Sequence, residues 1–200
     1  KGVIVHAAFF ATLNIYAIYN WTQQSVISIF VPMYSLILWG ILLATHVFVA
    51  LRYGQLIDGA KERIEQVYDV KDKYDLKSKA RWLLFWQWTL IAHAIMYGVG
   101  LLLIGLELAA QNLPMVLLAY VALGWLIGLS VHASLFWIVF KNIRGFWKWT
   151  LTIHLSAYIS TSVLLVVLNI MTAAGFPWSA IAIFGWGIGV GIHAILAYVR

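Results

Sequence analysis

Six apolar segments make up most of the chain, and most of them are long enough for a helix that crosses a bilayer. A transmembrane helix needs about 20 apolar residues to span a hydrocarbon core of about 30 Å. The segments cover residues 3–20, 27–51, 82–106, 114–140, 147–171 and 177–199. Because 64% of all residues are hydrophobic and only 10% are charged, a soluble domain of this size could not bury the apolar surface. The sequence therefore predicts an all-α integral membrane protein with six transmembrane helices.

Basic residues are confined to the chain ends and to two of the five connections between segments. They occur at Lys1, within 52–81, within 141–148 and at Arg200, whereas the turns near 20–28, 107–114 and 171–177 have none. Lys and Arg beside transmembrane helices stay on the cytoplasmic side. The pattern predicts a protein of the bacterial inner membrane with both termini in the cytoplasm. This distribution argues against nucleic acid as a partner, and the partners expected are membrane lipid and other proteins of a membrane complex.

The chain contains an internal repeat that includes every histidine. The second segment of each predicted hairpin has the pattern Trp, one residue, Ile, four residues, His, which ends at His46, His132 and His193. The first segment of each hairpin carries His6, His93 or His154, and Phe10, Tyr97 or Tyr158 follows four residues later. The two histidines of a hairpin are 39 or 40 residues apart. The agreement predicts three parallel repeats of one helical hairpin.

The repeat divides the chain into four parts. Hairpin repeats are expected at residues 1–51, 82–140 and 141–200, with a cytoplasmic charged connection at 52–81. Within that connection we expect a helix near the membrane surface and a short break near Asp75. It either serves only as a solvated linker or docks a protein partner. Since the chain starts at Lys1 and its first segment is the shortest, we also expect further residues before Lys1.

The third repeat carries a set of residues with a family resemblance. The set is Arg144-Gly145-Phe146-Trp147, His154, Tyr158, Asn169, Phe184-Gly185-Trp186-Gly187-Ile188-Gly189 and His193. It resembles the bacterial 2TM domain family, a two-helix membrane hairpin found alone or fused to sensor histidine kinases and DNA-binding regions. The first two repeats depart from it, with Phe10 in place of Tyr and Leu126 in place of Gly. The resemblance implies three tandem hairpins with paired histidines, and it implies no particular activity.

Paired histidines at matched depth predict a cofactor site. Each first helix enters the membrane where the second leaves it, so the sequence predicts a ring of imidazoles at one depth. Haem iron in b-type cytochromes takes axial histidines. The leading hypothesis is therefore a haem b-binding, cytochrome b-like subunit for electron transport or anchoring in a larger respiratory or photosynthetic complex. The predicted iron ligands, for up to three haems, are His6, His46, His93, His132, His154 and His193.

Other interpretations of the histidines stay open. They could brace the hairpins of a cofactor-free membrane scaffold or sensory module, since polar side chains often link transmembrane helices. They could instead bind (bacterio)chlorophyll in an antenna, or two or three converging histidines could supply part of the three or four ligands of a copper or zinc site. The first site is expected to be the narrowest, because Leu42 stands where the others have Gly128 and Gly189.

The residues give no sign of catalytic chemistry. The chain has no cysteine, and no acidic residue or lysine lies in the middle of an apolar segment. Ion-coupled transport normally needs an intramembrane carboxylate, and a retinal protein needs a buried lysine. No phosphate-binding loop or hydrolase motif occurs. Whether the protein is an enzyme is left open, and an electron-transfer or structural subunit is the preferred hypothesis.

Overall fold

The computed structural model describes residues 2–23, 31–67, 73–172 and 175–199. Its helices are α1 (Gly2–Thr22), α2 (Val31–Val67), α3 (Lys73–Ala110), α4 (Val116–Phe140), α5 (Phe146–Met171) and α6 (Trp178–Val199). All six are long and apolar enough to cross a membrane. The predictions of an all-α fold and of six candidate spans are therefore confirmed.

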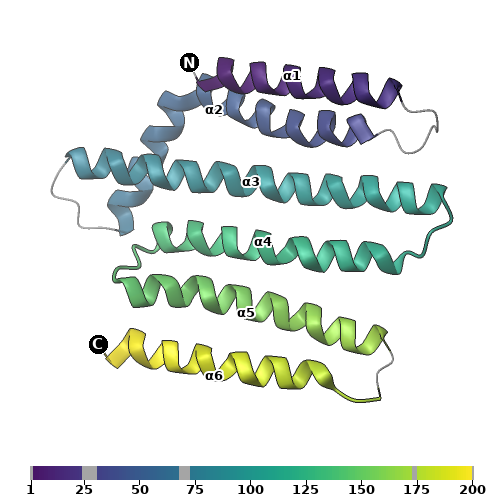
Figure 1. The fold of residues 1–200 in the computed structure, drawn as a ribbon. Helices are drawn as coiled ribbons and strands as arrows, with labels where there is room; N and C mark the ends of the chain where they lie inside the picture. Colours follow the sequence, from purple (N-terminus) through teal and green to yellow (C-terminus); the bar gives the residue numbers. More distant parts are fainter. Residues whose placement is uncertain (1, 24–30, 68–72, 173–174, 200) are drawn as a thin grey trace.

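The helices lie side by side in chain order (Figure 1). Each helix packs against the next one along the chain, from α1 on α2 to α5 on α6. Both termini lie at the same end of the helices, from which α1, α3 and α5 start and to which α2, α4 and α6 return, so the three hairpins run in the same direction. We call the end with the termini, where Arg144 and Lys148 lie, the basic end.

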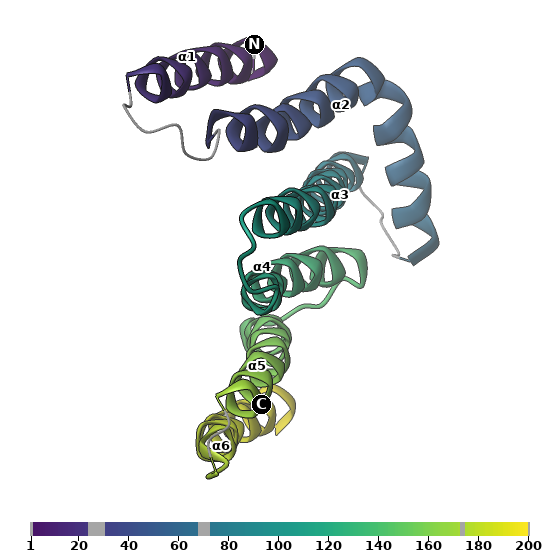
Figure 2. The ribbon, with the colours of Figure 1, turned by 90° about the vertical axis from the view of Figure 1, so that its right-hand side faces the viewer.

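The row is open, as the view turned by 90° shows (Figure 2). α1 and α6 are at its two extremes and do not close on each other. The predicted ring of imidazoles is therefore wrong in one respect, because the three histidine pairs are spread along a row. The physical reason is that each helix packs on the helices next to it in the chain, so the first hairpin lies apart from the third.

The charged connection 52–81 is mostly helical and continues its neighbouring helices. α2 extends to Val67, and beyond its apolar part it changes direction and runs across α3 (Figures 1 and 2). The extension buries Ile57, Ala60 and Ile64 against Leu83 and other apolar residues of α3. α3 begins at Lys73 with Asp75 in its first turn, and residues 68–72, where the break predicted near Asp75 would fall, lie outside the described residues.

The turn between α4 and α5 shows how adjacent hairpins are joined. Asn142 takes a left-handed conformation with φ of 51°, which asparagine tolerates better than most residues. The Ile143 amide then donates to the Ile138 carbonyl at 3.0 Å, closing the end of α4. Gly145, with φ of 91°, starts α5 in a region that favours glycine. Four residues, Asn142 to Gly145, thus reverse the chain at the basic end.

Candidate functional site

The two histidines of each hairpin lie within hydrogen-bond distance of one another. The Nδ1 atoms are 3.1 Å apart in His6–His46, 3.2 Å in His93–His132 and 3.1 Å in His154–His193. All three pairs join the first helix of a hairpin to its second helix. The structure therefore pairs the histidines within hairpins and not between them.

The repeated tryptophan is a hydrogen-bond donor to the histidine of the opposite helix. Trp39 Nε1 donates to His6 Nε2 at 2.8 Å, and Trp125 Nε1 donates to His93 Nε2 at 2.8 Å. The matching bond in the third hairpin, from Trp186 to His154, is 2.6 Å. The indole and the second histidine are on the same helix, seven residues apart. Together they hold the first-helix imidazole from both of its nitrogens.

A threonine completes the arrangement in the second and third hairpins. Thr89 Oγ1 lies 2.9 Å from His132 Nε2, and Thr150 Oγ1 lies 2.9 Å from His193 Nε2. The hydroxyl of Thr150 donates in turn to the Phe146 carbonyl at 2.8 Å, and Thr89 donates likewise to Phe85. We call the set of Thr150, His193, His154 and Trp186 the histidine network of the third hairpin.

The network has one consistent assignment of protons. An indole nitrogen can only donate, so His154 Nε2 must accept from Trp186 and, in a neutral ring, its proton sits on Nδ1. That Nδ1–H donates to His193 Nδ1, whose ring then carries its proton on Nε2 and donates it to Thr150 Oγ1. Every donor thereby meets an acceptor with both rings neutral. An N–H at His154 Nε2 would instead point at the Trp186 N–H and set two donors against each other.

The second-helix histidines also contact tryptophan rings of the first helix in the second and third hairpins. The ring of Trp86 meets His132 edge to face at 5.5 Å, and Trp147 meets His193 in the same way at 5.7 Å. The geometry is one that aromatic pairs prefer. Trp86 and Trp147 are each seven residues before the first-helix histidine, so these contacts follow the repeat as well.

The first hairpin differs from the others at the position of this threonine. Gly2 stands where the others have threonine, and a Cβ built on it would lie 3.5 Å from His46 Nε2 and Cε1. Beside the pair, His6, His46 and Leu42 line a cavity of about 440 Å³ together with Arg81 and Trp88 of α3. Within the described residues the Trp88 indole N–H has no hydrogen-bond partner. The size of Leu42 predicts a narrow site here. The structure nevertheless leaves this cavity beside the pair.

Other residues of the family resemblance form hydrogen bonds between the two helices of a hairpin. The Tyr158 hydroxyl donates to the Ile183 carbonyl across the third hairpin at 3.2 Å, and Tyr97 donates to Ala122 in the second at the same distance. Phe10 has no hydroxyl for this bond. Asn169 Oδ1 accepts from the Ser179 amide at 2.9 Å, in the first turn of α6. These bonds set the register of the two helices and hence the alignment of the histidines.

The pairs as arranged do not fit a bis-histidine haem. With metal–imidazole bonds of about 2.0–2.1 Å, two ligands on opposite sides of an iron stand about 4 Å apart, with a flat macrocycle between their rings. Here the facing nitrogens are separated by 3.1–3.2 Å. In the second and third hairpins the remaining nitrogens bond to tryptophan and threonine. Among the described residues no three His, Asp or Glu side chains converge as a copper or zinc site would require.

Sequence reasoning found the histidines and tryptophans but missed what the tryptophans and threonines do. The repeated tryptophan bonds to a histidine of the opposite helix. The signal for threonine was present, because Thr89 and Thr150 each precede a histidine by four residues. The first repeat has Gly2 at this position, so the spacing occurs in only two of the three repeats.

Comparison with known proteins bears on the third hairpin. The 2TM domain family matches residues 148–200, which include most of α5 and all of α6. The chain therefore contains a region similar to a 2TM domain, as the resemblance predicted for this repeat. No curated protein and no solved structure matches the chain.

Proposed function

We propose that the protein is a cofactor-free membrane scaffold or sensory module whose hairpins are each braced by a histidine pair. One observation carries the proposal. In the second and third hairpins, all four ring nitrogens of the pair have a hydrogen-bond partner within the same hairpin. Interhelical hydrogen bonds in membranes contribute about 0.6 kcal/mol each on average, so three bonds between helices give each hairpin a modest but specific brace.

The proton assignment favours a brace over a proton pathway. A relay must be able to reverse the direction of every hydrogen bond as a proton passes. The indole at one end of the network is only a donor, so the bond from Trp186 to His154 has a single direction. The proposed module is therefore non-catalytic, and its histidines serve structure.

The proposal includes the family relation, the location and the partners. We infer that the first two hairpins are diverged copies of the 2TM-like third one, because all three share the histidine pair and the tryptophan bond. The basic end points to a bacterial inner membrane with cytoplasmic termini, by the positive-inside rule. Exposed apolar side chains on the row, such as Phe184 and Ile188, are expected to face lipid or other subunits of a membrane complex.

A haem b subunit for electron transfer is the second candidate. The cavity beside the first histidine pair favours it, because it joins His46 and the cation of Arg81 around an unbonded indole N–H. Binding at the second or third pair would require the rings to leave their present partners. An antenna that binds (bacterio)chlorophyll would need the same change.

An absorption spectrum of protein purified from its native membrane separates these candidates. We expect no Soret band and no far-red band in either the air-oxidised or the dithionite-reduced sample. Histidine ¹⁵N NMR of the same sample should show the Nδ1–H tautomer at His93 and His154 and the Nε2–H tautomer at His132 and His193. A Soret band with reduced α and β bands would overturn the proposal in favour of haem, and strong far-red bands would do so in favour of chlorophyll.

A tryptophan substitution tests the brace directly. Trp186→Phe keeps the ring but removes the donor to His154, and we expect a loss of about 1 kcal/mol of stability. Trp149→Phe is the matched control, because Trp149 is 41% exposed near the basic end of the same hairpin. Thermal unfolding in detergent measures both variants. Equal stability of the two variants would argue against a bracing role.

A further inference from the structure

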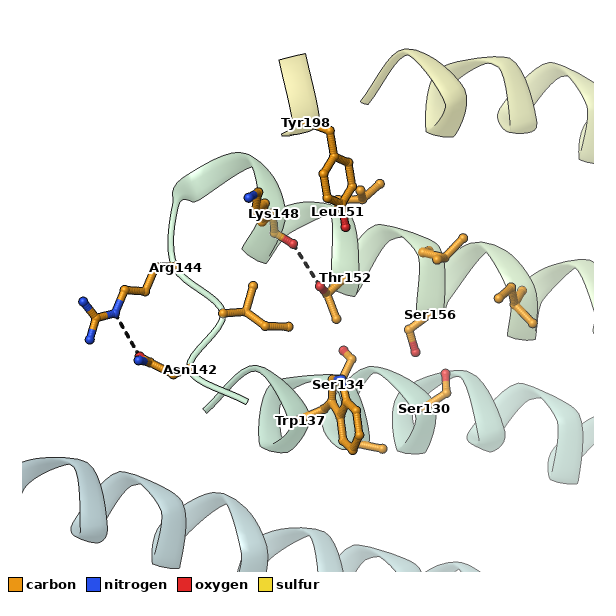
Figure 3. Close-up of a pocket in the computed structure, with 14 residues that line it drawn as sticks. Ser130, Ser134, Trp137, Asn142, Arg144, Lys148, Leu151, Thr152, Ser156 and Tyr198 are labelled. Carbon is orange, nitrogen blue, oxygen red and sulfur yellow. Dashed lines mark hydrogen bonds between the residues drawn. The ribbon is translucent and has the colours of Figure 1, made fainter. Parts of the chain in front are cut away.

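A groove opens between α4 and α5 at the basic end, away from the histidine pairs. Its volume is about 1000 Å³, and it is bordered by the last turns of α4, the turn that follows, the first half of α5 and Tyr198 of α6 (Figure 3). It lies at the junction of the second and third hairpins. At the corresponding junction of α2 and α3, the extension of α2 packs Ile57, Ala60 and Ile64 against α3, and the cavity beside the first histidine pair is smaller, at about 440 Å³.

Cations mark the mouth of the groove. Arg144 and Lys148 both line it and both are exposed. Arg144 uses its Nε to donate to Asn142 Oδ1 at 3.1 Å (Figure 3), which orients the guanidinium and leaves its terminal nitrogens for a ligand. Lys148 Nζ lies 5.3 Å from the centre of the Tyr198 ring. Two positive charges thus lie at the basic end of this groove.

No carboxylate offsets these cations locally. The groove is lined by no acidic residue, and the sequence has none after Glu107. Elsewhere at the basic end, Lys61 pairs with Asp58 and Lys79 pairs with Asp75. The mouth of the groove is therefore suited to an anion supplied from outside the chain.

The lining changes character with depth. Beyond the cations come the hydroxyls of Thr152, Ser134 and Ser156, about one to two helical turns further along (Figure 3). The aliphatic side chains of Leu155 and Ile159 continue the wall on the side of α5. A phospholipid has the same order of groups along its length, with phosphate first, then ester oxygens and then hydrocarbon. A free phosphate would use only the mouth.

We propose that this groove binds one anionic phospholipid. Arg144 and Lys148 hold its phosphate, the hydroxyls face its glycerol ester region, and one acyl chain lies along Leu155 and Ile159. Basic pockets between transmembrane helices suit such head groups, and each Lys or Arg near the surface adds measurably to the attraction. The lipid would fill the junction between hairpins and so join the second to the third. This site is independent of the histidine networks.

Lipid titration of delipidated, detergent-purified protein tests the proposal. Native mass spectrometry would compare phosphatidylglycerol with phosphatidylcholine for the full chain and for variants. We expect Arg144→Gln with Lys148→Gln to weaken phosphatidylglycerol binding by about tenfold or more. Ser156→Leu should also weaken it, since it fills the groove without changing charge. Arg63→Gln with Lys77→Gln is the matched control, because it removes two exposed cations at the same end outside the groove, and it should bind as the parent does.

Several outcomes would overturn the inference. Equal loss of binding in the groove variant and the control would mean attraction by total charge. Equal affinity for phosphatidylcholine and phosphatidylglycerol would remove the role of the cations. Displacement of phosphatidylglycerol by millimolar inorganic phosphate would make the groove a free phosphate site. Because the readout is lipid binding, these results are distinct from those that test the histidine brace.

Discussion

At the scale of single residues, a hydroxyl four positions before a histidine separates the second and third hairpins from the first. Thr150 both accepts from His193 and donates to the carbonyl of Phe146. In lipid, an imidazole N–H without an acceptor is costly, because no water replaces the lost partner. The threonine therefore decides whether the second histidine of a pair is fully bonded.

Replacing that threonine should weaken the third hairpin. Thr150→Val keeps the branched shape but leaves His193 Nε2–H without an acceptor, and we expect a loss of about 1 kcal/mol. Thr152→Val is the control, since among the described residues the Thr152 hydroxyl donates to the Lys148 carbonyl of its own helix and to no neighbouring helix. Thermal unfolding in detergent measures both. The reciprocal change Gly2→Thr should stabilise the first hairpin, and no gain there would contradict the assigned role.

At the scale of helix pairs, close packing places the tryptophan where it can reach the histidine. Gly100 of α3 is buried, and a Cβ built on it would lie 2.6 Å from Cζ3 of the Trp125 ring. That ring must stay in place for Trp125 to donate to His93. Gly100 thus links the packing of α3 on α4 to the hydrogen bonds of the second hairpin.

A methyl group at this position should disrupt the second hairpin. Gly100→Ala forces the rigid indole to move, which we expect to cost about 1–3 kcal/mol and to alter the His93 tautomer seen by ¹⁵N NMR. Gly98→Ala is the matched control in the same helix, because nothing lies within 4 Å of its added Cβ. It should be neutral or slightly stabilising. A normal His93 signal in Gly100→Ala would show that the indole is not fixed by this contact.

At the scale of the whole molecule, an open row of helices is held together by contacts between sequence neighbours. The extension of α2 adds to this by crossing α3 and burying Ala60 and Ile64, which are 0% and 2% exposed. The charged connection is thereby tied to the bundle through its apolar face. Its opposite, charged face is left for solvent or a protein partner.

Shortening a buried side chain in the extension should release it from α3. We expect Ile64→Ala to cost about 2–4 kcal/mol of local stability and to speed hydrogen exchange at the amides of 54–67. Glu65→Ala, at an exposed neighbouring position, should leave exchange unchanged. The tautomers of the histidines should stay the same in both variants. Unchanged exchange in Ile64→Ala would mean that the extension does not depend on this core.

Much of the architecture follows from sequence alone. Six spans, the common direction of the hairpins and the matched depth of His154 and His193 could be predicted because lipid imposes local rules. A helix that spans a membrane must satisfy its own backbone, so its length and composition can be read from one segment at a time. The repeat then aligned the histidines without knowledge of any contact.

Only the tertiary structure decided how those residues meet. The bond from Trp186 to His154 and that between His193 and Thr150 depend on the rotation of each helix about its axis and on side-chain rotamers. The same is true of the approach of Gly100 to Trp125. Apolar positions surround these helices on all sides, so no periodic stripe marks the face that packs. The open row and the docking of α2 across α3 likewise arise from which surfaces fit together, a property of helix pairs that no single segment encodes.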